Sequence, residues 1–106
     1  MASSKAYLAY VLDQLSGLPE VTWRAMMGEY LLYYRGRLFG GVYDDRLLVK
    51  DVPAARALLP SAAQERPYEG AGPMLLPDVV DDRARLQALI LAMYPELPEP
   101  KKRKHK

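Results

Sequence analysis

The side chains best suited to catalysis are few in this chain and poorly placed for it. The single histidine, His105, lies in a basic run at the C-terminus, where no folded neighbour would orient an imidazole for proton transfer or metal binding. The absence of cysteine excludes thiol catalysis, disulfides and cysteine-ligated zinc. No nucleophile elbow, phosphate loop or dinucleotide fingerprint occurs. We therefore predict no enzymatic activity, no catalytic residue, no metal site and no cofactor, and a small-molecule enzyme is the least favoured of three hypotheses.

Two pairs of adjacent carboxylates could in principle support acid–base chemistry or bind magnesium. The pair Asp44-Asp45 is more typical of a tight turn, because aspartate tolerates the left-handed backbone region. The pair Asp81-Asp82 precedes a predicted helix, where negative charge meets the positive end of the helix dipole. We interpret both pairs as structural.

Three glycines lie close together in the segment GRLFGG. Their spacing does not match a phosphate-binding loop, and they fall within a predicted hairpin instead of between a strand and a helix. We predict that Gly36 serves a turn. Gly40 and Gly41 are expected to mark a β-bulge or a place where a helix approaches the sheet closely.

Most of these candidates lie in a segment where apolar side chains recur at every second residue, as in the strands of a β-meander. Short apolar runs are separated by two-residue turns, which is typical of antiparallel hairpins. The predicted strands span residues 21–26, 29–34, 37–43 and 46–50. The segment MLL, at 74–76, is a further short candidate.

Three helices are predicted around this sheet. Residues 3–16 carry apolar side chains at helical spacing, with Ser3 or Ser4 as N-cap and Gly17 as a left-handed stop. Residues 79–94 form the second long helix, capped by Asp78 or Asp81. A short helix is expected within 51–60, with Asp51 as its cap.

The aromatic residues of the meander raise the question of which surface is exposed. Trp23 alternates in phase with Val21 and Ala25, so we predict that its side chain is largely buried. The strand at 29–34 is apolar on both faces, since Leu31 and Tyr33 alternate with three other apolar side chains. Such a strand is either covered on both sides or carries an exposed aromatic patch, which would indicate a partner site.

The fold class predicted from these elements is α+β. We expect an antiparallel sheet of four to five strands, with the N-terminal and C-terminal helices packed mainly on one face. Residues 1–96 are expected to form one domain and residues 97–106 a flexible basic tail. The start of the chain lacks the pattern of a signal peptide, and no apolar run is long enough to span a bilayer. A cytoplasmic protein is therefore expected.

The charge is concentrated in the tail. The whole chain has 15 basic and 13 acidic residues, but five of the basic ones are Lys101, Lys102, Arg103, Lys104 and Lys106. The body is therefore slightly acidic, without the basic face of a nucleic-acid-binding fold. The five cations are candidate contacts to polyanions, with weak and non-specific binding expected.

The segment RAMMGEYLLYYRGRLFGGVYDDRLLVK resembles the core of the TfoX (Sxy) N-terminal domain family. That pattern runs from arginine and methionine through a glycine turn, a tyrosine-containing strand and a glycine hairpin to a strand ending in a basic residue. The later segment RPYEGAGPMLLP and the helix after it are also similar to small stand-alone members. The likeness spans about residues 3–98. In place of the more usual Met-Phe-Gly-Gly run, this chain has MMGEY.

The resemblance implies an α+β, non-enzymatic domain that acts through protein contacts in transcriptional regulation, such as the control of competence. It supplies no catalytic residues. The favoured hypothesis is a regulatory interaction module with a candidate surface at Arg24, Glu29, Tyr33 and Arg35. The alternative is a nucleic-acid-associated protein that uses its basic tail. The protein partner is not identified, a membrane partner is not expected, and homodimerisation is left open.

Overall fold

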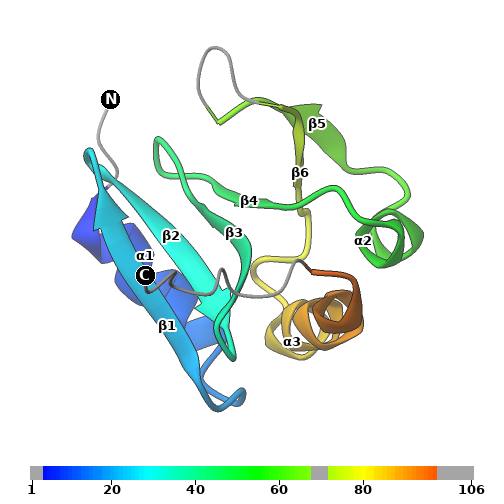
Figure 1. Cartoon of the computed structure of the whole chain (residues 1–106), viewed down its shortest axis with the longest axis horizontal. Coiled ribbons are helices and arrows are strands. Elements are labelled where there is room, and N and C mark those ends of the chain that lie inside the picture. Colours follow the sequence, from blue (N-terminus) through cyan, green and yellow to red (C-terminus); the bar gives the residue numbers. More distant parts are fainter. Residues whose placement is uncertain (1–3, 68–71, 98–106) are drawn as a thin grey trace, which may run out of the picture.

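The computed structural model of the chain describes residues 4–67 and 72–97. The described residues form three helices, a short 3₁₀ turn and a six-stranded sheet (Figure 1). The elements in chain order are α1 (Lys5–Gln14), β1 (Val21–Met26), β2 (Glu29–Tyr34), β3 (Arg37–Val42), β4 (Leu47–Val49), α2 (Pro53–Leu58), β5 (Ala63–Glu65), β6 (Met74–Leu76), α3 (Arg83–Met93) and η1 (Tyr94–Glu96).

The sheet is entirely antiparallel, in the order β1-β2-β3-β4-β6-β5. This confirms the predicted α+β class and the four strands of the meander, and β6 confirms the short candidate strand at 74–76. The sheet has one strand more than the four to five predicted. The additional strand, β5, has only three residues and no hydrophobic alternation, so the sequence pattern did not reveal it.

Two-residue turns join the four strands of the meander, as predicted, and the left-handed backbone expected at Asp44-Asp45 occurs in all three turns. Both central residues have positive φ in the turns at Met27-Gly28, Arg35-Gly36 and Asp44-Asp45. Two consecutive residues of this kind form the type I′ turn, whose twist matches that of the strands it joins. The Asp44-Asp45 pair therefore has the structural role that the sequence indicated.

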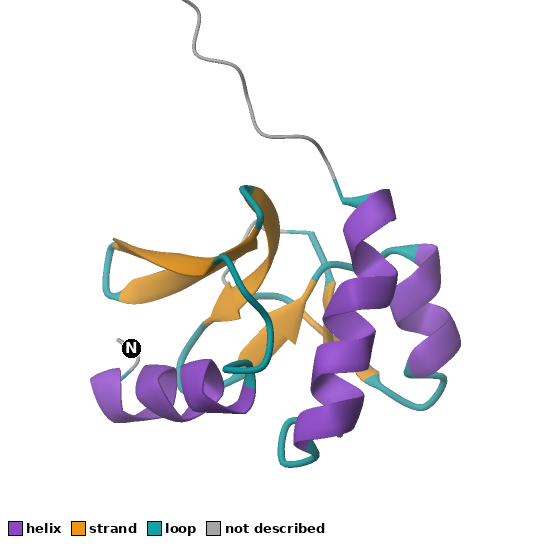
Figure 2. Ribbon diagram, turned by 90° about the horizontal axis from the view of Figure 1, so that it is seen from below, coloured by secondary structure: helices purple, strands orange, loops and turns teal. Residues whose placement is uncertain are grey.

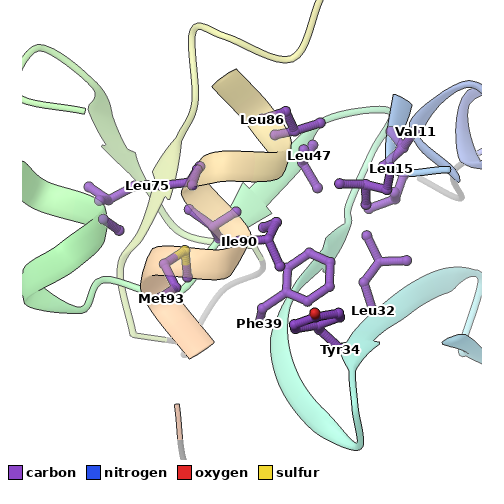
Figure 3. Close-up of a cluster of buried hydrophobic side chains, with 14 of the residues drawn as sticks. Val11, Leu15, Leu32, Tyr34, Phe39, Leu47, Leu75, Leu86, Ile90 and Met93 are labelled. Atoms are coloured by element: carbon purple, nitrogen blue, oxygen red, sulfur yellow. The ribbon is translucent and has the colours of Figure 1, made fainter. Parts of the chain in front are cut away.

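All three helices contribute to one hydrophobic core on one face of the sheet. Figure 2 shows α1 beneath the β1–β2 hairpin and α2 and α3 side by side at the other end of the molecule. Figure 3 shows Leu32, Phe39 and Leu47 from the sheet meeting Leu15, at the C-terminal end of α1, and Ile90 of α3. Each of these five side chains is at most 1% exposed, which confirms the predicted helix packing.

Some predicted helix ends were wrong in detail. Ser4 caps α1 by accepting the Tyr7 N–H, but Asp82, and not Asp78 or Asp81, caps α3. Val52, and not Asp51, is the cap residue of α2.

The left-handed conformation predicted for Gly17 does not occur. A Cβ at this position would lie 2.5 Å from the Gln87 side chain. The missing side chain leaves room for the Gln87 amide, which donates to the Gln14 carbonyl at 2.9 Å.

The two glycines of β3 lie where the backbone approaches other groups closely. The β2–β3 register shifts between Leu32 and Tyr33, so that Phe39 is an extra residue in β3. A Cβ on Gly40 would lie 2.1 Å from the Leu48 carbonyl oxygen, and one on Gly41 would lie 2.6 Å from the Tyr30 carbonyl oxygen. The predicted bulge is confirmed, and the close approach comes from neighbouring strands and not from a helix.

Candidate functional site

The sheet has a second face that the helices do not cover. Strand pairing aligns Arg24 with Leu31, and Thr22, Tyr33 and Leu38 in a neighbouring row. Opposed residues in an antiparallel sheet point to the same side, and the alternate residues of β2 belong to the helix-side core. We call the side that carries Arg24, Leu31, Tyr33, Leu38 and Leu48 the helix-free face.

A hollow of about 590 Å³ opens on this helix-free face. It extends from β1 across β2 and β3 to the segment before β6, and its lining includes Met26, Leu31, Leu38, Tyr43, Lys50 and Met74. The middle of the sheet is covered here, because Tyr43 and Leu48 are both buried. Towards β1 the cover is thinner, since Leu31 and Leu38 are half-buried and Met26 is exposed. The hollow is thus a mainly apolar surface open to solvent.

The charged groups around the hollow differ in how well they are compensated. Asp51 is paired with Arg56 and also accepts from the Gln64 side-chain amide at 2.9 Å. The Arg56 guanidinium holds the pKa of the Asp51 carboxyl below its ordinary value. Within the described residues, the Lys50 ammonium and the Arg24 guanidinium make no side-chain hydrogen bond or ion pair. The uncompensated charge of this surface is therefore positive.

The structure brings three of the four predicted surface residues to one face. Tyr33 and Arg24 belong to the helix-free face, and Glu29 lies on the same side because it is paired with Met26. Glu29 is half-buried and accepts the Asp44 backbone N–H at 3.1 Å, so it also ties two turns together. Arg35 lies apart, with its guanidinium 5.6 Å from the centre of the Tyr34 ring, which belongs to the helix-side core.

Sequence reasoning missed the two residues that define the far side of the hollow. Lys50 and Met74 are separated from Tyr33 by long stretches of sequence, and only the pairing of β4 with β6 brings them to the same surface. The unusual run of apolar residues on both sides of β2 was the available signal. The predicted polyanion contacts of the tail, residues 101–106, lie outside the described residues.

The prediction that Trp23 is largely buried was wrong. Its side chain is 43% exposed, although its ring meets the Tyr30 ring edge-on at 5.5 Å. Pairing with Leu32 places it on the helix side of the sheet, as its alternation indicated. However, β1 is the outermost strand, so Trp23 has a neighbouring strand on one side only.

No described helix is long and apolar enough to cross a membrane. In the same part of the chain, no group of three or more histidine or carboxylate side chains is arranged to hold a metal ion.

An antiparallel six-stranded sheet with helices on one face and type I′ turns in its meander defines a small α+β domain. A family model described as the TfoX N-terminal domain matches residues 13–94. The chain therefore belongs to the TfoX N-terminal domain family, as the sequence pattern indicated.

One relative is a protein of Spirochaeta aurantia described as an uncharacterized 12.7 kDa protein in the trpE 5′ region. It is 36% identical over 107 residues, which cover 100% of this chain and 93% of the relative. The similarity therefore spans both chains almost completely. No solved structure matches the chain.

Proposed function

We propose that this domain is a non-enzymatic regulatory module that binds a protein partner through its helix-free face. The observation that supports this proposal is the open hollow of about 590 Å³, which is lined by apolar side chains and by Lys50. Arg24 lies beside it on the same face, opposite the lining residue Leu31. Exposed apolar surface bordered by polar groups is typical of protein interaction sites. Arginine and tyrosine, here Arg24 and Tyr33, are the residue types enriched where such interfaces concentrate their binding energy.

The chemistry of the hollow indicates the kind of partner. Met26 and Met74 line it from opposite sides, and methionine side chains adapt to differently shaped apolar groups. Lys50 and Arg24 would favour a segment with acidic residues beside its apolar ones. A regulator of transcription, the role associated with the family, fits this mode of action because it works by contact and needs no catalytic group.

The proposal is tested by affinity capture from native lysate with matched surface variants. Arg24→Glu and Tyr33→Ala change the helix-free face, whereas Leu91→Ala removes an exposed apolar side chain from α3, where Leu91 is 50% exposed. We expect each of the first two variants to weaken binding of the captured partner by about 30-fold, as for a central interface residue. Leu91→Ala should bind like wild type.

The captured partner is then purified and titrated against the three variants. Equal affinity for all of them would contradict the proposal. Arg35→Glu distinguishes the surface predicted from the sequence, which includes Arg35, from the helix-free face, which does not. The substitution should have little effect on affinity if the helix-free face alone binds, because Arg35 lies beside Tyr34.

A nucleic-acid-associated role is the alternative, and the observation that favours it is the cluster of five cations in the last six residues. Such a cluster attracts any polyanion at low salt. The salt series described in the Discussion distinguishes this role from protein binding.

A further inference from the structure

The outer edge of β1 is a six-residue strand edge without the features that usually prevent pairing with another strand. β1 ends the strand order of the sheet, and no described strand pairs with its outer side. Five of its six side chains are exposed, including Trp23 at 43% and Met26 at 36%. Edge strands that remain single are usually protected by proline, a bulge or several charges. β1 has no proline and one charge, Arg24, so its edge is open to pairing.

The hairpin geometry determines which backbone groups point outwards from this edge. Met26 and Glu29 flank the two-residue type I′ turn, and the pair flanking such a turn exchanges hydrogen bonds. Hydrogen-bonded and non-hydrogen-bonded pairs then alternate along the ladder. The Arg35 N–H donates to the Glu20 carbonyl at 3.0 Å, which continues the same alternation. The even-numbered residues of β1 therefore bond to β2, and Val21, Trp23 and Ala25 direct their N–H and C=O groups outwards.

These outward groups are complementary to those of a second copy of the same strand. A twofold axis through Trp23 places Trp23 opposite itself and Val21 opposite Ala25 of the second copy, in both directions. Each opposed pair consists of two outward-pointing residues, so every free N–H and C=O of the edge gains a partner. A shift by two residues along the strand would leave Val21 or Ala25 opposite a residue beyond β1. The register centred on Trp23 therefore forms the most hydrogen bonds.

The side chains agree with this register. On the helix side, the two Trp23 rings would lie opposite each other, and cross-strand aromatic pairs stabilise antiparallel sheets. On the helix-free face, Arg24 would lie opposite Thr22, so no like charges are opposed.

We propose that the protein forms a homodimer in which the β1 strands of two copies pair antiparallel about Trp23, giving one continuous twelve-stranded sheet. The interface is the strand edge, so the dimer does not depend on the proposed partner of the helix-free face. The twofold axis lies perpendicular to the sheet, so both helix-free faces and both hollows would be on the same side.

The first test removes one outward N–H while keeping the strand. Ala25→Pro eliminates the outward Ala25 donor but leaves every β1–β2 hydrogen bond, because proline is tolerated at the outer side of an edge strand. Ala25→Val is the matched control, since it enlarges the same side chain and keeps the N–H. Molar mass is measured by sedimentation equilibrium from about 1 µM to about 1 mM, the range of weak associations.

We expect wild type and Ala25→Val to approach twice the chain mass of 12.0 kDa, and Ala25→Pro to remain a monomer with a native circular dichroism spectrum. A wild-type monomer across the whole range would overturn the proposal. So would a dimer that Ala25→Pro leaves intact.

The second test is specific for the register and does not depend on how proline is tolerated. The chain has no cysteine, so Thr22→Cys and Arg24→Cys each introduce a single thiol. In the proposed register these positions face each other as a non-hydrogen-bonded pair, with Cα atoms about 4.5 Å apart, which is within disulfide range. An equal mixture should cross-link rapidly under mild oxidation, and each variant alone at least about tenfold more slowly. Equal cross-linking of the mixture and of either variant alone would rule out the register.

Discussion

The Arg37 guanidinium lies 4.5 Å from the centre of the Tyr94 ring and donates to the carbonyl oxygens of Tyr94 at 3.1 Å and Leu97 at 3.3 Å. One side chain at the start of β3 thus fixes the place where α3 ends and η1 follows. Tyr34 completes the arrangement, since its ring meets the Tyr94 ring edge-on at 5.3 Å. The sheet and the C-terminal helix are joined here by polar contacts as well as by the hydrophobic core.

Arg37→Met should lower the free energy of unfolding by about 2–3 kcal/mol, because it removes two charge-assisted hydrogen bonds and a cation–π contact. Arg35→Met is the matched control, since that guanidinium is exposed and lies 5.6 Å from the Tyr34 ring; a loss below about 1 kcal/mol is expected. Urea unfolding monitored by circular dichroism measures both. Equal losses would show that Arg37 does not join α3 to the sheet.

Gly40→Ala should destabilise the fold by about 1–3 kcal/mol or more, the usual cost of inserting a methyl group where no space exists. The added Cβ would lie 2.1 Å from the Leu48 carbonyl oxygen and 2.9 Å from the Val49 Cα, and neither atom can move without opening the sheet. Gly72→Ala is the control, because nothing lies within 4 Å of the position that its Cβ would take; it should be neutral or stabilising by up to about 1 kcal/mol. Thermal unfolding of both variants measures their melting temperatures. A melting temperature for Gly40→Ala equal to or above that of Gly72→Ala would contradict the prediction.

Trp23→Ala should cost only about 1 kcal/mol at low protein concentration, because the exposed side chain contributes mainly its contact with Tyr30. Phe39→Ala, which truncates an aromatic side chain that is 0% exposed, should cost about 3–5 kcal/mol. Denaturant melts of the two variants provide the comparison. A loss of about 3 kcal/mol or more for Trp23→Ala would mean that the outer surface of β1 is covered in the monomer.

The pair of Asp51 and Arg56 should contribute to stability in a pH-dependent way. Because Arg56 lowers the pKa of Asp51 from its ordinary value of 3.8, the contribution is fully present above about pH 4 and is lost as the pH falls through the lowered pKa. A double-mutant cycle with Asp51→Asn and Arg56→Met should therefore give a favourable coupling at neutral pH. That coupling should disappear at low pH, where the carboxyl is protonated; a coupling that persists there would refute the assignment.

Deletion of residues 101–106 should abolish DNA binding at low salt. Five cations can give a slope of at most about −4.5 in log K against log salt, at about −0.9 per neutralised phosphate. Fluorescence anisotropy over a salt series, with full-length and shortened protein, measures this slope. We expect non-specific binding that is lost near physiological salt, with an unchanged melting temperature after the deletion. Sequence-selective binding by the shortened protein would favour the nucleic-acid role for the folded domain.

The meander could be predicted nearly residue by residue because its determinants are local. The turns at residues 27–28, 35–36 and 44–45 each have a glycine or an aspartate at the second position, where left-handed backbone is required, and the strands between them alternate clearly. The family pattern lies in this same segment. What could be read from the sequence was therefore the part of the fold in which neighbours in sequence are neighbours in space.

Exposure and the hollow could not be predicted in this way. Periodicity assigns Trp23 to a face, but only the lengths and positions of the helices decide whether that part of the face is covered. Similarly, Met26 and Met74 line one hollow because β4 pairs with β6, a long-range contact with no local signal. Gly17 was misread for the same reason, since its role depends on the distant Gln87.

The turn between β1 and β2 has a chemical consequence. The Met27 side chain is 95% exposed, whereas Met93 is 0% exposed in the core. Oxidation of a thioether to its sulfoxide follows access, so peroxide would reach Met27 long before Met93. Because the Met27 side chain is almost fully exposed, its sulfoxide would leave the fold intact, whereas a sulfoxide at Met93 would place a polar group in the core.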